Sequence, residues 1–215
     1  MGKRVAFPLW PSLVLTAATV ILLLLMHRVK NQAALGPALP VLGPIQEFTL
    51  TNQNTAPVTL ADLRGHVWVA DIIFTRCPLQ CLRMTAQMKA LSEALPEKSS
   101  AKLVSLTTDA DYDTPPVLKA YASRFAQDTP RWQFLTGTKK QIAHLAVDSL
   151  KLTAVEKPAD QRESPNDLFI HSTIFVVVDK SGHLRGVFDT VGEGVDPSVV
   201  KEQILAAVRR LEREP

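Results

Sequence analysis

The sequence predicts an α/β domain in which helices cover both faces of a largely parallel sheet, preceded by one N-terminal membrane helix. Apolar, β-rich runs alternate with segments of helical periodicity along most of the chain, and a strand hairpin and a last helix follow. Residues 9–26 contain no charged residue. These patterns predict three parts: a membrane anchor with its flanks at 1–30, a tether at 31–44 and the folded domain at 45–215.

The N-terminal apolar run is long enough to cross a bilayer. The span Val5–Met26 matches the ~20 residues that a helix needs to traverse the hydrocarbon core. A cleaved signal peptide is the alternative, but His27–Lys30 follows the run in place of the small residues of a cleavage site. Basic residues flank the run on both sides, so the positive-inside rule leaves its orientation open. We therefore expect an uncleaved, single-pass anchor.

The rest of the chain has the composition of a globular domain on a short tether. The whole chain is 46% hydrophobic, which is enough to fill a core, and its net charge of +3 is too small to predict nucleic-acid binding. Residues 31–44 are rich in proline and glycine, which is typical of a semi-extended linker. The basic run Arg209–Arg213 is interrupted by Glu212 and suits the solvated C-terminal end of a helix.

The first strands of the domain are predicted from apolar runs and turn residues. Ile45–Leu50 and Ala56–Leu60 flank a polar turn, which predicts a hairpin. Leu60–Gly65 then predicts a single helical turn that ends at its glycine. Val67–Phe74 is a continuous apolar run, typical of a strand buried on both faces. We expect this strand to lie inside the sheet.

A helix is predicted directly after that strand. Pro78 fits a first helical turn because its missing N–H has no partner there. An apolar face recurs at spacings of three and four residues. This face consists of Cys81, Met84, Thr85, Met88, Leu91 and Leu95.

Further strands and helices alternate through the second half of the chain. The predicted elements are a strand at Lys102–Thr107, a helix from Pro115 to Phe125, a strand at Arg131–Leu135, a helix at Thr138–Leu150, a strand hairpin at 173–178 and 183–188, and a helix at Asp196–Arg210. Thr153–Ile170 is rich in proline and charge, so we expect an exposed, mobile loop there. Loops longer than ~12–15 residues are often functional.

The only two cysteines, Cys77 and Cys81, lie four residues apart at the junction of a buried strand and a helix. A helix start and the neighbouring Arg76 both favour a thiolate, which is the reactive form for redox chemistry and for metal binding. Such a pair can close a disulfide or bind a soft metal. Zinc usually takes four protein ligands, whereas Cu(I) accepts fewer and prefers sulfur. Two buried core cysteines are the alternative without function.

Among the five histidines, His171 is distinguished by its position between the expected loop and a core strand. Spacing alone predicts no ligand role for the others, which are His27, His66, His144 and His183. Met84 and Met88 are also possible copper ligands, but they fit the apolar helix face and are expected to pack in the core.

Together these residues resemble the Sco/SenC family. The matching motifs, in chain order, are Leu60–Gly65, Val67–Cys81 with Phe74-Thr75-Arg76-Cys77 and the CxxxC pair, Leu103–Thr107 leading to Asp113–Pro115, Trp132–Gly137, and His171–Ser172 before the strand that ends at Val178–Gly182. The resemblance covers roughly Ile45–Leu211, nearly the whole predicted domain. A CxxxC pair alone would be a weak signal, but these motifs in this order are specific.

The resemblance implies a thioredoxin-like fold on a membrane tether. It further implies copper, as Cu(I) or Cu(II), bound by Cys77, Cys81 and His171. By the same resemblance, this copper is delivered to the copper-bearing subunit of a cytochrome oxidase or used in reducing the thiols of that subunit's copper site. Other copper chaperones or thiol reductants are implied as partners. Family members face the periplasm in bacteria or the mitochondrial intermembrane space, and the short tether without a transit-type leader favours a bacterial inner membrane.

The chain departs from the family pattern beside the predicted ligands. Leu79, Gln80 and Leu82 stand where the family usually has an acidic residue between the cysteines and a proline after them. Ile170 precedes the histidine in place of an acidic residue. A missing carboxylate should ease thiolate formation at Cys77 and change the affinity for copper.

A thiol–disulfide oxidoreductase that uses Cys77 and Cys81 is the alternative function, and it needs no histidine. A peroxidase is less consistent with the sequence, because Phe74 stands where the peroxidase-like pattern has threonine. Copper loading itself requires both thiols reduced, so the two functions are compatible.

Overall fold

The computed structural model describes the following residues: 18–23, 26, 38–77, 79–125, 130–162, 164, 166–192 and 194–214, with the side chains of Ala154 and His171 left out. The chain forms two units, Met1–Ala38 and Leu39–Pro215. Residues 18–23 and 26 are helical. Most of the expected span Val5–Met26 lies outside the described residues, and no helix among the described ones is long and apolar enough to cross a membrane.

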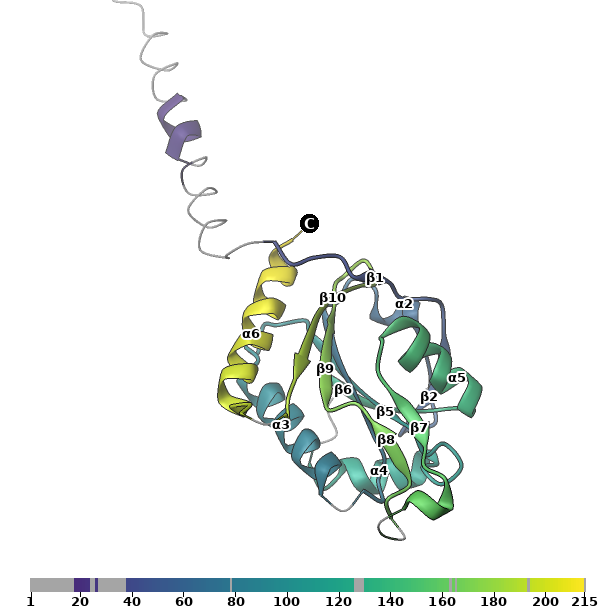
Figure 1. Ribbon diagram of the computed structural model, residues 1–215. Helices are drawn as coiled ribbons and strands as arrows, with labels where there is room; N and C mark the ends of the chain where they lie inside the picture. The colour runs from purple at the N-terminus through teal and green to yellow at the C-terminus, as the bar shows by residue number, and fades with distance from the viewer. Residues whose placement is uncertain are drawn as a thin grey trace, which may run out of the picture. The chain divides into compact units, whose positions relative to one another are not determined.

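The folded unit is built on an eight-stranded sheet with the order β1-β10-β9-β4-β5-β6-β2-β3 (Figure 1). Its strands are β1 (Gly43–Pro44), β2 (Thr49–Asn52), β3 (Pro57–Thr59), β4 (Trp68–Ile73), β5 (Lys102–Thr107), β6 (Trp132–Thr136), β9 (Ile174–Val178) and β10 (His183–Asp189). β4, β5 and β6 are parallel, and the other pairs are antiparallel. The predicted α/β sheet with added antiparallel strands is confirmed.

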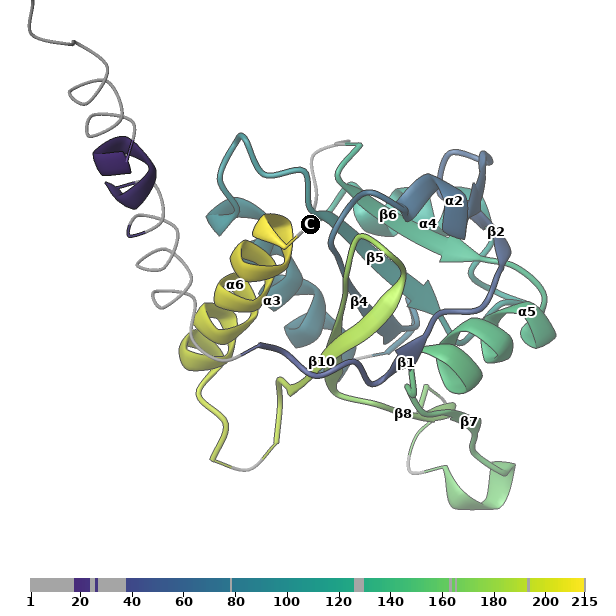
Figure 2. The same cartoon turned by 90° about the horizontal axis from the view of Figure 1, so that it is seen from above.

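Helices cover both faces of this sheet. They are α2 (Leu60–Leu63), α3 (Gln80–Ala94), α4 (Pro115–Ala122), α5 (Lys139–Ala143), the π-helical η1 (His144–Ser149), the 3-10 helix η2 (Ala159–Gln161) and α6 (Pro197–Arg213). Figure 2 shows α3 and α6 side by side on one side of the sheet and α5 on the other. The helix expected at Thr138–Leu150 is thus α5 continued by a π-helical stretch.

β4 has apolar side chains on both of its faces because it lies between two hydrophobic cores. Val69 and Ile73 pack into the core under α3, α4 and α6. Trp68, Ala70 and Ile72 pack into the core on the α2 and α5 side. All five are fully buried, as the continuous apolar run predicts for an inner strand. The strand ends at Ile73, just before the segment that carries Cys77.

α3 presents the predicted apolar face to the core. Its buried residues are Cys81, Met84, Thr85, Met88 and Leu91. The helix begins at Gln80, and Pro78, which we expected in its first turn, lies outside the described residues. Cys77 therefore precedes the first helical residue and belongs to the connection between β4 and α3.

The segment Thr153–Ile170, which we expected to be an exposed loop, contains regular structure. β7 (Ala154–Glu156) and β8 (Phe169–His171) form a separate two-stranded antiparallel sheet. An ion pair of 2.6 Å between Lys157 and Asp167 supports the hairpin. Strands of three residues are too short to show a hydrophobic alternation, so charge and proline dominated the sequence pattern.

Residues at the end of the expected tether belong to the folded unit. Leu42 N–H donates to Leu184 O at 2.8 Å, and Ile45 N–H donates to Gly182 O at 2.8 Å. β1 pairs with β10 between these two hydrogen bonds. Composition assigned residues 31–44 to the tether, whereas the backbone of residues 42–45 runs along β10.

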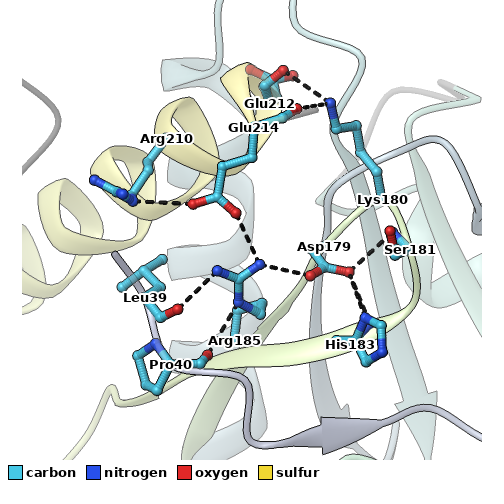
Figure 3. Close-up of polar contacts among 10 residues, drawn as sticks. All are labelled: Leu39, Pro40, Asp179, Lys180, Ser181, His183, Arg185, Arg210, Glu212 and Glu214. Atoms are coloured by element: carbon cyan, nitrogen blue, oxygen red, sulfur yellow. Dashed lines mark hydrogen bonds and ion pairs between the residues drawn. The ribbon is translucent and has the colours of Figure 1, made fainter. Parts of the chain in front are cut away.

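The guanidinium of Arg185 ties both ends of this unit together (Figure 3). Its Nη2 and Nε donate to the carbonyls of Leu39 and Pro40 at 2.8 and 3.1 Å. Its Nη1 donates to Asp179 at 2.7 Å and to Glu214 at 2.9 Å. Arg185 is only 8% exposed, so its charge depends on these partners. We call Arg185 with these four partners the Arg185 clasp.

We predict that Arg185→Met destabilises the domain by about 3–5 kcal/mol, because it leaves two partly buried carboxylates without their cation. The free energy of unfolding in urea measures this loss. Hydrogen exchange at Leu42 and Ile45 should accelerate in the same variant. Arg64→Met, which breaks an exposed ion pair with Glu47, is the matched control and should cost less than about 1 kcal/mol. Equal losses in the two variants would contradict the prediction.

Candidate metal centre

The structure brings Cys77 and Cys81 together as thiols where α3 begins. Cys77 N–H donates to Phe74 O at 3.2 Å, which closes a turn directly after β4. Cys81 N–H, in the first turn of α3, donates to Cys77 Sγ at 3.4 Å. Such N–H groups have no partner within their own helix. Cys77 Sγ therefore accepts a hydrogen bond at the positive end of the helix dipole, where negative charge on sulfur is favoured.

Cys81 is fully buried, and its thiol keeps its proton. Burial raises the pKa of Cys81 strongly, and the hydrogen bond and charge of Cys77 and the charge of Asp71 raise it further. Phe74 N–H donates to Cys81 Sγ at 3.4 Å and acts in the opposite direction. A metal ion or a second sulfur can bond to Cys81 Sγ only by replacing this proton.

Arg76 is paired with a carboxylate of another loop, so its charge does not act on Cys77 alone. Its Nη2 and Nε lie 2.5 and 3.0 Å from Asp109 Oδ2. Its guanidinium also stacks on the ring of Tyr112 at 4.2 Å from the centroid. The sequence suggested a local charge effect, whereas the structure shows a connection between the cysteine loop and the loop that follows β5.

Asp113 makes the second connection between these loops. It is fully buried and accepts hydrogen bonds from Thr75 N–H at 3.0 Å, from the Thr75 hydroxyl and from the Thr107 hydroxyl at 2.5 Å. Burial raises the pKa of Asp113, and the hydrogen bonds from Thr107 and Thr75 oppose that shift. The residue two positions before Cys77 is thereby held to the end of β5.

Sequence reasoning missed these acidic residues as parts of the site. Asp109, Asp111 and Asp113 follow β5, and Cys77 follows the neighbouring parallel strand β4. Carboxyl ends of parallel strands meet at one edge of a sheet, where functional side chains gather. That rule was one signal in the sequence that could have identified these residues. A second signal was Asp71, a lone charged residue in an apolar run.

The backbone that carries His171 is connected to the cysteine loop through aromatic contact. Phe169 and Phe74 meet edge to face with ring centroids 5.2 Å apart. His171 ends β8 and pairs with Ala154. Its side chain is outside the description, and among the described side chains no group of three or more His, Cys, Asp or Glu is arranged for a metal. The third ligand stays a prediction.

The remaining candidates have local roles in the described part of the chain. His66, His144 and His183 contact Ser100 O, Asp148 and Asp179 respectively. Met84 and Met88 are fully buried in the core, as expected. Two of the residues that depart from the family pattern, Leu79 and Ile170, are 56% and 50% exposed.

Comparisons with known proteins agree with this geometry. The profile of the SCO1/SenC family matches residues 43–209. The SCO1 protein homolog of Bacillus subtilis is 34% identical over 145 residues, which cover 66% of this chain and 72% of that protein. A protein of Stutzerimonas stutzeri whose description names copper binding is 31% identical over 150 residues, 69% of this chain and 70% of that protein.

A solved structure bears out the predicted thioredoxin-like fold. BsSco, in which a disulfide switch was identified, is described as a member of the Sco family of cytochrome c oxidase assembly proteins. It matches with a TM-score of 0.68 and 29% identity, over 83% of this chain and 100% of that chain.

We predict that iodoacetamide alkylates Cys77 before Cys81 in the native, metal-free protein. Cys81 is fully buried and its pKa is raised, and each unit of raised pKa lowers the thiolate fraction about tenfold. Peptide mass spectrometry over time measures the two rates, and we expect them to differ by on the order of tenfold or more. Denatured protein, in which both cysteines react alike, is the control. Faster labelling of Cys81 would contradict the described burial.

We predict that Asp113 makes stability depend on pH. Its raised pKa means that the native state holds this proton to higher pH than the unfolded chain. The free energy of unfolding therefore falls as pH rises from about 4 towards the folded pKa. Asp113→Asn removes this titration, so the stability advantage of the wild type over the variant should shrink with rising pH. Urea denaturation at several pH values measures it, with the exposed Asp111→Asn as the matched control, and a difference independent of pH would refute it.

Proposed function

The chain belongs to the SCO1/SenC family, and on that premise we propose that it binds copper and acts in assembling the copper centre of a cytochrome c oxidase. The observation that carries the proposal is the contact between two buried thiols where α3 begins. Thiolates are soft ligands that select Cu(I) over harder cations. The description of the S. stutzeri relative and the family of BsSco support the same metal and the same process.

We assign Cys77, Cys81 and His171 as the ligands. Positions 169 and 171 belong to the same face of β8 because side chains alternate along a strand. Phe169 packs on Phe74, whose backbone N–H contacts Cys81 Sγ. This register supports His171 as the third ligand. The hairpin of β7 and β8 carries it as a separate small sheet.

The protein's own groups prepare the two sulfurs for the metal. Cys81 gives up a proton when copper binds, so affinity rises with pH. The backbone N–H groups of Cys81 and Phe74 point at the sulfurs and stabilise their negative charge after that proton leaves. Because both cysteines are buried, they would hold a copper ion away from bulk water.

We further propose that residues 5–26 anchor the protein as a single-pass helix in a bacterial inner membrane, with the domain in the periplasm. The uncharged run at residues 9–26 and the proline- and glycine-rich linker after it support this placement. Its partners are then the copper-bearing oxidase subunit and the copper chaperones or thiol reductants that load it.

A thiol–disulfide oxidoreductase is the second candidate, because the two thiols are in hydrogen-bond contact and BsSco has a disulfide switch. In that reaction the Cys77 and Cys81 thiols give two electrons and two protons to a substrate disulfide. The substrate becomes two thiols, and Cys77 and Cys81 form a disulfide.

We predict that the domain binds one Cu(I) and that His171→Ala lowers the affinity by at least about tenfold. Anaerobic competition with a Cu(I) chelator, together with the Cu(II)–thiolate absorption, measures this loss. Cys77→Ser and Cys81→Ser should abolish binding. His144→Ala is the matched control, because His144 lies on η1 and contacts Asp148. If His171→Ala and His144→Ala behave like the wild type, the three-ligand site is wrong.

The same variants separate the two candidate functions. Reduction of a disulfide substrate by the wild type and by His171→Ala, but not by Cys77→Ser, favours the oxidoreductase if no copper accompanies the purified protein. Copper retained on purification and lost in His171→Ala favours the assembly factor.

A further inference from the structure

One end of the folded unit carries an exposed cluster of cations. Lys98, Arg209 and Arg213 are exposed and line a pocket of about 360 Å³ together with Ser99 and Ser100. In the described part of the chain, none of these three cations forms an ion pair. We call the three cations the basic end.

The nearest acidic group in this pocket is bound to the protein itself. Glu212 Oε1 accepts hydrogen bonds from Ser99 Oγ at 2.7 Å and from Ser100 N–H at 3.0 Å. Arg131 Nη2 donates to Ser99 O at 3.1 Å and holds the same loop. Glu97 is exposed nearby in sequence. The basic end therefore exposes three cations beside fewer carboxylates, and the hydrogen bonds of Glu212 and Arg131 fix the loop that carries Ser99 and Ser100.

The basic end is a local feature, not a consequence of overall charge. The first 38 residues contain four of the 24 cations and none of the 21 carboxylates. Residues 39–215 thus carry 20 cations against 21 carboxylates, a formal net charge of −1. A concentrated positive surface on a nearly neutral domain points to a specific anionic partner.

The chain enters the folded unit at this same end. The Arg185 clasp holds Leu39 and Pro40 beside Glu214, which directly follows Arg213 (Figure 3). Lys180 also donates to the carbonyl of Glu212 in the last turn of α6 and to that of Glu214 directly after the helix. With an anchor that ends near Lys30, the eight residues before Leu39 span at most about 28 Å. The basic end therefore lies within reach of the head groups.

We propose that the basic end docks on the anionic lipid head groups of the membrane that holds the chain, an inference that rests on the anchor proposed above. Each Lys or Arg near such a surface raises membrane partitioning about fivefold. The effect falls off within a Debye length of about 8–10 Å, so only cations near the tether exit contribute.

Docking in this way directs the candidate metal centre away from the membrane. Trp68, where β4 begins, pairs with Val178, next to Asp179 of the clasp. The strand ends at Ile73, before the loop that carries Cys77. Its six residues separate the two ends by about 20 Å. The cysteines are then presented to partners that protrude from the bilayer.

The test uses residues 39–215 without the N-terminal unit. Both hydrophobic cores lie within this part, which forms a compact unit by itself, so we expect it to fold alone. Co-sedimentation with vesicles of phosphatidylcholine, with and without phosphatidylglycerol, measures partitioning. We expect binding only with phosphatidylglycerol, weakened by salt, and about hundredfold lower when Lys98→Gln, Arg209→Gln and Arg213→Gln are combined.

A triple variant of equal charge is the control: Lys119→Gln, Lys140→Gln and Lys151→Gln remove exposed cations on α4, α5 and the segment after η1. It should change partitioning less than about threefold. Equal loss in both triple variants, or equal binding to both vesicle types, overturns the proposal. So does a basic-end variant that binds vesicles normally but loses an acidic protein partner.

The anchor is tested separately by alkaline carbonate extraction of the full chain. The docking surface is refuted, and the anchor supported, if the full chain resists extraction and the basic-end variant binds vesicles as well as the wild type does. The anchor is refuted, and the lipid-binding role of the basic end supported, if the full chain is released and the basic-end variant loses vesicle binding.

Discussion

The buried carboxylate of Asp113 is the interaction on which the candidate centre depends. It joins Thr75, two residues before Cys77, to Thr107 at the end of β5. The ion pair between Arg76 and Asp109 runs in parallel with it. Without these connections, the short segment between β4 and α3 would have only its own turn to fix it. Two cysteines on such a segment would not stay in contact, because each added rotatable residue increases the entropy cost of ordering.

The two ends of the sheet differ in the functional groups that lie there. At the carboxyl ends of β4 and β5 lie two buried cysteines and buried carboxylates. At the other end, the Arg185 clasp fixes where the chain enters the fold, and solvent-exposed cations surround that point. The parallel strands β4, β5 and β6 produce this division, because all three start at one edge of the sheet and end at the other. This division of the two ends is compatible with the membrane anchor and the lipid docking that we propose.

The site itself combines features that favour different states of sulfur. Hydrogen-bond donors at the start of α3 favour charged sulfur, whereas burial keeps Cys81 protonated. A thiol in this condition is held back from oxidation and alkylation but remains available to a soft cation that displaces its proton. With Leu79 and Gln80 in place of an acidic residue, this balance depends on backbone groups, on burial and on the charges of Cys77 and Asp71. Family membership and local chemistry thus both support the proposed binding of copper by these two sulfurs.

The sequence by itself determined the elements whose signals are local: the inner strand β4, the apolar face of α3, the hairpin of β9 and β10, and the position of the cysteine pair between strand and helix. Hydrophobic periodicity within one segment carries that information. Only the tertiary structure decided which groups meet across distance. Arg185 binds the carbonyl of Leu39, 146 residues away, and Asp109 balances Arg76. The hairpin of β7 and β8 exists through pairing that neither three-residue strand reveals alone. Such choices depend on long-range geometry, because a charge or a short strand is compatible with many partners until the sheet brings one of them close.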